Sequence, residues 1–182
     1  MLPDYQLLDA VKHNDLAEAR DAFDRGANPD ARDFNGLTAL QVACTQGHMP
    51  MAELLLTLNA DLNATFGKRK QTLLHWAADQ GSFGIASFCL THKVQVNAQQ
   101  ADGSTPLMLA AKGGHQYVVQ LLLKNNALLS PRDRKHATAR SVAERGGHYQ
   151  IVKLIDAASD SRPWLRVAEQ ACNANSGERQ LF

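Results

Sequence analysis

The feature that most constrains this chain is a pattern that repeats every 33 or 34 residues. Four glycines stand 34, 33 and 33 residues apart, and four threonines keep the same intervals. A fixed period of this length is typical of repeat architectures, in which stacked copies of one small unit build a continuous core. The two columns are Gly47, Gly81, Gly114 and Gly147, and Thr38, Thr72, Thr105 and Thr138.

Further columns keep the same phase and hold small or apolar residues. Each threonine precedes a helical pattern, where its hydroxyl can accept a free backbone N–H, and Pro106 takes the first helical position after Thr105. Each glycine follows that pattern, where a left-handed residue ends a helix at little cost. Every repeat is therefore expected to contain an inner helix, a turn and an outer helix. The apolar columns are Ala43, Ala77, Ala110 and Ala143; Met51, Ile85, Val118 and Ile151; and Leu54, Phe88, Leu121 and Leu154.

The fourth repeat carries the most informative segment. Residues 103–115 are Gly-Ser-Thr-Pro-Leu-Met-Leu-Ala-Ala-Lys-Gly-Gly-His, and residues 118–123 are Val-Val-Gln-Leu-Leu-Leu. This segment resembles the ankyrin signature, with Met108 in place of the usual histidine, whereas the third repeat keeps that histidine as His75. The resemblance covers residues 4–158 and implies an all-α ankyrin-repeat solenoid of about five helix-turn-helix repeats with short β-hairpin fingers.

The columns also define the expected domain boundaries. An ankyrin-repeat domain is expected over residues 1–158 and a C-terminal tail over residues 159–182. The last repeat resembles a cap, because Arg140, Glu144 and Asp156 stand in columns that are apolar elsewhere. Arg140 and Glu144 have the i,i+4 spacing of a helical ion pair. The expected repeats cover residues 4–32, 33–65, 66–99, 100–132 and 133–158.

The tail departs from the repeat pattern. Trp164, Val167, Ala168 and Ala171 fall at i, i+3, i+4 and i+7, which predicts one short amphipathic helix with Ser161 as its cap. Two roles stay open for this helix. It either docks against the repeats or binds a partner.

Composition argues against several classes of protein. Nineteen basic and eighteen acidic residues leave a formal net charge of +1, so no overall field favours nucleic acid or a membrane surface. No run of about 18 apolar residues occurs, and the N-terminus lacks the pattern of a secretory signal. The three cysteines are far apart and favour a reducing compartment. We expect a cytoplasmic protein, or one delivered into a host cell if the source is microbial.

No catalytic or metal-binding constellation is recognisable. Cys44 and Cys89 occupy small, buried columns and are predicted to be core residues, and His75 falls in the inner-helix histidine column of the resembled family. No nucleophile motif, phosphate loop or dinucleotide turn occurs. We therefore expect no enzyme activity, no cofactor and no metal. Three more histidines follow the column glycines in register, where the resemblance implies structural hydrogen bonds: His48, His115 and His148.

The resemblance implies that a partner binds at the finger tips and at the exposed sides of the inner helices, which together line a concave groove. Phe34 is the most notable of these residues because aromatic side chains dominate interface hot spots, although it could instead pack on the neighbouring finger. The finger positions are Phe34, Asn35, Leu37, Lys68, Arg69, Gln71, Asp102, Ser104, Arg134 and Lys135. The inner-helix positions are Thr45, Gln46, Asp79, Gln80, Lys112 and Arg145.

Two classes of function stay open. The first is a protein-protein interaction module, acting as a scaffold, adaptor, inhibitor or effector whose partner is another protein. The second is a binder of nucleic acid or of an acidic ligand through two basic finger tips. The net charge near zero and the lack of aromatic residues between the basic ones argue against nucleic acid. We favour the first class and expect a monomer. The basic tips are Lys68-Arg69-Lys70 and Arg132-Asp133-Arg134-Lys135.

Overall fold

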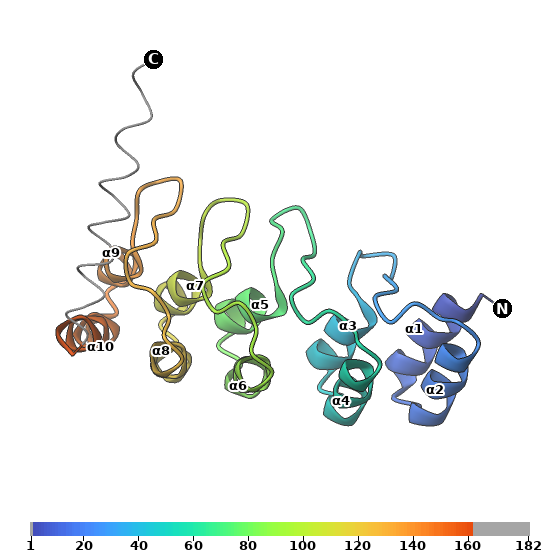
Figure 1. Cartoon of the computed structure of the whole chain (residues 1–182). Coiled ribbons are helices and arrows are strands. Elements are labelled where there is room, and N and C mark those ends of the chain that lie inside the picture. The colour runs from blue at the N-terminus through green and yellow to red at the C-terminus, as the bar shows by residue number, and fades with distance from the viewer. Residues whose placement is uncertain (1, 162–182) are drawn as a thin grey trace, which may run out of the picture. The chain divides into compact units, whose positions relative to one another are not determined.

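The computed structural model describes residues 2–161, which form ten helices in five pairs (Figure 1). This architecture confirms the all-α repeat fold, and the outer helices lie where the columns predict them. The inner helices are α1 Pro3–His13, α3 Ala39–Gln46, α5 Leu73–Gln80, α7 Pro106–Gly113 and α9 Ala139–Arg145. The outer helices are α2 Leu16–Asp24, α4 Met49–Thr57, α6 Phe83–Thr91, α8 Gln116–Lys124 and α10 Tyr149–Asp160.

The chain divides into two compact units, Met1–Leu74 and His75–Phe182, here named unit 1 and unit 2. Unit 1 contains α1 to α4 and the fingers that precede α3 and α5, which project to one side of it (Figure 1). Unit 2 contains α6 to α10 and the fingers that precede α7 and α9. Helix α5 begins at the end of unit 1.

The threonine and glycine columns perform the predicted local roles. Thr38 Oγ1 accepts the backbone N–H of Gln41, and the Gln41 side chain accepts that of Thr38, which completes a capping box at the start of α3. Thr105 caps α7 in the same way by accepting from Met108. The column glycines are left-handed, as Gly114 illustrates with a φ of 76°. The starts of α3 and α7, and the ends of the inner helices at the column glycines, are thus encoded locally.

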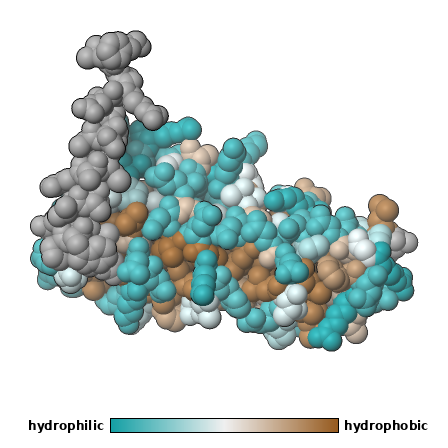
Figure 2. Space-filling model, in the orientation of Figure 1, coloured by the Kyte–Doolittle hydropathy of each residue, from teal (hydrophilic) through white to brown (hydrophobic). Residues whose placement is uncertain are grey.

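The core of each unit lies between its stacked helices. The four column alanines have no exposed surface, because a larger side chain would separate the helices that meet there. Longer apolar side chains such as Met51 and Val118 fill the space between inner and outer helices. On the face shown in Figure 2, hydrophilic residues cover most of the visible surface, and apolar residues show between them.

The fingers are tighter than the expected β-hairpins. Within residues 2–161 the strand-like pairing of the fingers consists of two isolated antiparallel bridges. One joins Arg32 to Thr38, and the other joins Phe66 to Gln71. The fingers before α7 and α9 are closed by turn hydrogen bonds instead. Each finger has too few residues to extend a ladder, so turn chemistry fixes its shape.

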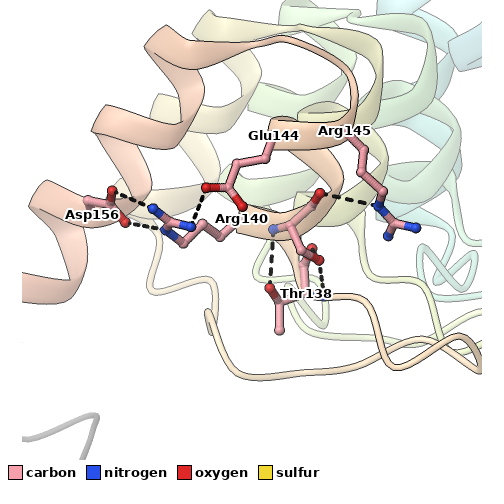
Figure 3. A network of polar contacts seen from close by, with 6 residues as sticks. Thr138, Arg140, Glu144, Arg145 and Asp156 are labelled. Carbon is pink, nitrogen blue, oxygen red and sulfur yellow. Dashed lines mark hydrogen bonds and ion pairs between the residues drawn. The ribbon is translucent and has the colours of Figure 1, made fainter.

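The last described repeat ends in a polar network on α9 and α10 (Figure 3). Arg140 donates from Nε to Asp156 Oδ1 at 2.7 Å and pairs with Glu144, which confirms the predicted i,i+4 contact. The hydrogen bond that Arg140 donates to Asp156 raises the pKa of Arg140, and Glu144 adds to this effect. Ser161 is the C-cap residue of α10. The helix predicted around Trp164 lies outside the described residues.

Candidate functional site

The first finger of unit 1, Arg32–Thr38, is held by its own side chains. The Asp33 carboxylate accepts the backbone N–H groups of Asn35 and Leu37, each at 2.9 Å. Arg32 Nη1 donates to the carbonyls of Gly36 at 2.7 Å and Thr65 at 3.0 Å, which ties this finger to the base of the next one. The tip therefore has a fixed backbone.

Phe34 stands on this fixed tip with 88% of its surface exposed, so it does not pack on the neighbouring finger. Its one ring contact among the described residues is with Lys12, whose Nζ lies 5.4 Å from the ring centroid. Asn35 is also exposed, whereas Leu37 is half-buried. The fixed tip thus presents an aromatic ring with an ammonium group beside it.

Lys12 was not predicted as a site residue. It lies in the last turn of α1, in the column that continues as Thr45, Asp79, Lys112 and Arg145 in later repeats. Extending the inner-helix column back by one period would have found it.

The second finger of unit 1, Phe66–Gln71, is closed by two hydrogen bonds between the backbones of Phe66 and Gln71, at 2.8 and 3.0 Å. Lys68, Arg69 and Lys70 between them are exposed, and in the described part of the chain none of the three forms an ion pair. Gln71 itself is half-buried. This tip is a compact cluster of three unneutralised cations.

The two predicted site residues on α3 differ in how accessible their side chains are to a partner. Gln46 is exposed at the end of the helix. Thr45 is half-buried, and its hydroxyl donates to the carbonyl of Gln41 at 2.9 Å, so it offers less to a partner.

In unit 2 the fingers before α7 and α9 are joined through the backbone. Arg134 N donates to the carbonyl of Asp102 at 2.8 Å, and the side chains of Asp102, Arg134 and Lys135 are all exposed. The Asp133 carboxylate accepts the N–H groups of Lys135 and Ala137, so this tip is fixed in the same way as the tip at Asp33. An acidic and a basic tip therefore lie together.

Ser104 is the predicted site residue that the structure removes from the surface. Only 8% of it is exposed, its N–H donates to Asp102 Oδ1, and its carbonyl lies 3.1 Å from His75 Nε2. It shapes the finger and is too buried to contact a partner. On the inner helices of unit 2, Gln80, Lys112 and Arg145 are exposed, and Asp79 is half-buried.

The histidines that follow the column glycines form the predicted structural hydrogen bonds. Each ring contacts a backbone carbonyl in the inner helix of the preceding repeat, and one nitrogen of each ring is thereby committed. The pairs are His48 Nδ1 and Val11 O at 3.0 Å, His115 Nε2 and Asp79 O at 3.0 Å, and His148 Nε2 and Lys112 O at 3.1 Å.

Cys44, Cys89 and His75, the buried side chains that could act as nucleophile or base, have no access to solvent. Cys44 and Cys89 have no exposed surface, as expected for core residues, and burial raises the pKa of the Cys44 thiol to about 12. His75 has no exposed surface, and burial lowers its pKa, so the ring is neutral at neutral pH. Among residues 2–161, no three His, Cys, Asp or Glu side chains gather in a group that could hold a metal ion.

Unit 2 carries exposed aromatic residues that the columns did not single out. Phe83, Tyr117 and Tyr149 lie in the first turns of α6, α8 and α10, and each is at least half exposed. A hollow of about 380 Å³ adjoins Tyr149 at the starts of α8 and α10. These residues could have been identified from the sequence, because each is a large aromatic residue in the first turn of an expected outer helix.

Comparison with known proteins agrees with this geometry. The family model described as ankyrin repeats (3 copies) matches residues 7–100 and 87–162. The chain is 33% identical to Protein glp-1 of Caenorhabditis elegans over 73% of its length, and 36% identical to the human transient receptor potential cation channel subfamily A member 1 over 68%. It spans only 11% of each of these relatives.

A third relative is closer in size. The chain is 31% identical to an ankyrin repeat protein of Rickettsia bellii over 66% of its own length and 67% of that protein. Within the described part of the chain, no helix has the length and apolar character needed to cross a membrane. The helix pairs, the left-handed glycines and the matched family model together show that the chain belongs to the ankyrin-repeat family.

Proposed function

We propose that this protein is a non-enzymatic interaction module that binds a partner protein through its finger tips and the exposed sides of its inner helices. Ankyrin repeats generally serve as protein-protein interaction modules. The observation that carries the proposal is the contrast between fixed finger backbones and exposed tip side chains. At the first finger, two hydrogen bonds to Asp33 fix the backbone while Phe34 stays exposed.

Such a tip binds with little loss of conformational entropy, because the backbone is ordered before the partner arrives. The same design recurs at the finger of Asp133, where Arg134 and Lys135 are exposed. We propose that the protein acts as a monomer in the cytoplasm, or inside a host cell if its source is microbial, as a scaffold, adaptor, inhibitor or effector.

The test is capture of partners by the full-length protein, followed by mass spectrometry and measurement of affinity. We expect Lys68→Ala/Arg69→Ala or Arg134→Ala/Lys135→Ala to weaken binding of the captured protein. The control is Lys124→Ala/Lys153→Ala, which removes the same charge from exposed positions on outer helices. If both finger variants bind as well as the control while deletion of residues 162–182 abolishes binding, the proposal is wrong.

The basic tips support one alternative, a binder of nucleic acid or an acidic ligand. Lys68, Arg69 and Lys70 are exposed and have no ion-pair partner among the described residues. Filter binding with single-stranded and duplex oligonucleotides over a range of salt concentrations separates the classes. A steep decrease of affinity with salt and no captured protein would favour the alternative.

A further inference from the structure

We infer that unit 1 binds an acidic peptide segment of the partner protein, whose carboxylates contact the Phe66–Gln71 finger and whose apolar side chain packs on Phe34. This inference rests on the proposed function and specifies the chemistry of one partner. It follows from the distribution of charge in unit 1 and from the contact between Phe34 and Lys12.

Charge is separated in unit 1. Residues 1–74 contain ten acidic and seven basic side chains, a formal net charge of −3, yet the two fingers hold four of the basic residues and one acidic residue, Asp33. The Asp33 carboxylate is occupied by two backbone N–H groups. Elsewhere Asp15 caps α2, Asp4 accepts from Asn28 N at 2.7 Å, and Asp30 accepts from Asp61 N at 2.8 Å. The finger side is therefore locally cationic on an otherwise acidic unit.

The basic side chains of this surface have different roles. Arg32 is committed to two backbone carbonyls and positions the fingers relative to each other. Within residues 2–161 the side chains of Lys68, Arg69 and Lys70 have no such partners, and they can pair with carboxylates of an incoming chain. Exposed pairs of this kind contribute little individually, so a cluster of three is more significant than one.

Phe34 and Lys12 supply the second half of the surface. The ring is the most exposed of the large hydrophobic side chains in the described chain, and Lys12 Nζ lies 5.4 Å from its centroid. The Lys12 ammonium has no ion-pair partner in the described residues, so it can also donate to a carboxylate. An apolar side chain of the peptide would pack on the Phe34 ring, and the acidic residues that flank it would pair with the Lys12 ammonium.

The charge distribution favours a peptide over a nucleic acid. Electrostatic forces between exposed charges are screened beyond about 8 Å at physiological ionic strength, so a short peptide on the fingers experiences mainly the local cations. A long polyanion would also approach the acidic remainder of unit 1, whose net charge opposes it. Base stacking would rest on Phe34 alone among the finger residues of unit 1 that are exposed.

The experiment uses the full-length protein and fluorescence anisotropy with three labelled twelve-residue peptides. The first has a central leucine flanked by glutamates, the second has glutamines in place of the glutamates, and the third has alanine in place of the leucine. A twelve-nucleotide single-stranded oligonucleotide is the fourth probe. We expect the first peptide to bind most tightly and its affinity to decrease with salt.

Two variants and one matched control complete the design. Lys68→Ala/Arg69→Ala should lower affinity for the first peptide by about tenfold, as expected for two exposed ion pairs. Phe34→Ala should lower it by about thirtyfold and have little effect on the alanine peptide. The control, Arg20→Ala/Arg25→Ala, removes the same charge from exposed positions on and directly after α2 and should change little.

Three results would overturn the inference: equal effects of the finger variant and the control, equal binding of the glutamate and glutamine peptides, or tighter binding of the oligonucleotide than of any peptide. If a captured partner protein still depends on Arg134 and Lys135 in that case, the inference fails and the proposed function stands. If neither finger pair affects capture, both fail.

Discussion

Replacement of Gly114 by alanine tests how much the contact of the His148 ring with the preceding repeat stabilises unit 2. Gly114 has a φ of 76°, and a Cβ built there would lie 2.7 Å from Cε1 of the His148 ring. The ring is also close to Gly146 on another side, so it cannot move aside freely. We expect it to leave its site and to lose the contact between its Nε2 and the carbonyl of Lys112 at 3.1 Å.

The magnitude follows from two contributions to the free energy of unfolding. The left-handed conformation costs an alanine about 1–2 kcal/mol, and the lower entropy of the unfolded chain offsets about 0.4–1 kcal/mol of that. Loss of the exposed hydrogen bond between His148 and Lys112 adds about 0.5–1.5 kcal/mol. Gly114→Ala should therefore destabilise unit 2 by about 1.5–2.5 kcal/mol. Gly147 has the same backbone conformation, with a φ of 74°, but open space at its Cβ, so Gly147→Ala should cost only about 1 kcal/mol.

Urea denaturation monitored by far-UV circular dichroism measures both variants, with constant m-values as the check on a single transition. A double-mutant cycle with His148→Ala isolates the ring contribution, because the cost of Gly114→Ala should then approach that of Gly147→Ala. Equal losses for the two glycine variants in the wild-type background would refute the reasoning. So would an unchanged cost of Gly114→Ala in the His148→Ala background.

Three further predictions concern the rest of the chain. Phe34→Ala and Lys68→Ala/Arg69→Ala should change the free energy of unfolding by no more than about 0.5 kcal/mol, because these side chains are exposed; a larger loss in urea denaturation would assign them to the fold. Hydrogen exchange should show early opening over residues 84–98, because α6 contains a glycine and few strong helix formers; uniform protection across all repeats would contradict this. Burial lowers the pKa of His75 in the folded state, so the unfolded state binds more protons, and stability should decrease as the pH falls below about 6.5; denaturation at pH 7.5 and 5.5 should show a smaller decrease in His75→Gln than in the wild type.

The helices and their packing could be predicted from the sequence because the columns encode backbone states. Thr38 and Gly114 specify where helices begin and end through local hydrogen bonds and a left-handed φ, and neither depends on distant residues. The histidine contacts were predictable for the same reason, since a fixed period places each ring beside the preceding inner helix. His115, for example, reaches the carbonyl of Asp79, 36 residues earlier.

The surface was only partly predictable, because columns do not specify side-chain direction. The contact of Lys12 with Phe34 depends on the direction in which the Arg32–Thr38 finger projects relative to α1. Ser104 is buried, and the neutral His75 ring approaches its carbonyl, a tertiary contact that the finger pattern does not contain. Such contacts are worth about 1 kcal/mol, similar to the energy differences between rotamers, so sequence alone does not determine them.

The last prediction separates backbone order from charge at the first finger. Asp33 accepts two backbone N–H groups and also places a negative charge beside a cationic surface. Asp33→Asn keeps a side-chain oxygen that can accept and removes the charge, whereas Asp33→Ala removes both. If tip order matters for binding, Asp33→Asn should bind the leucine-glutamate peptide at least as tightly as the wild type, and Asp33→Ala should bind it more weakly despite its more favourable charge. Anisotropy titrations at two salt concentrations measure this. Equal strengthening by both substitutions would mean that charge alone determines affinity and that the fixed tip makes no contribution.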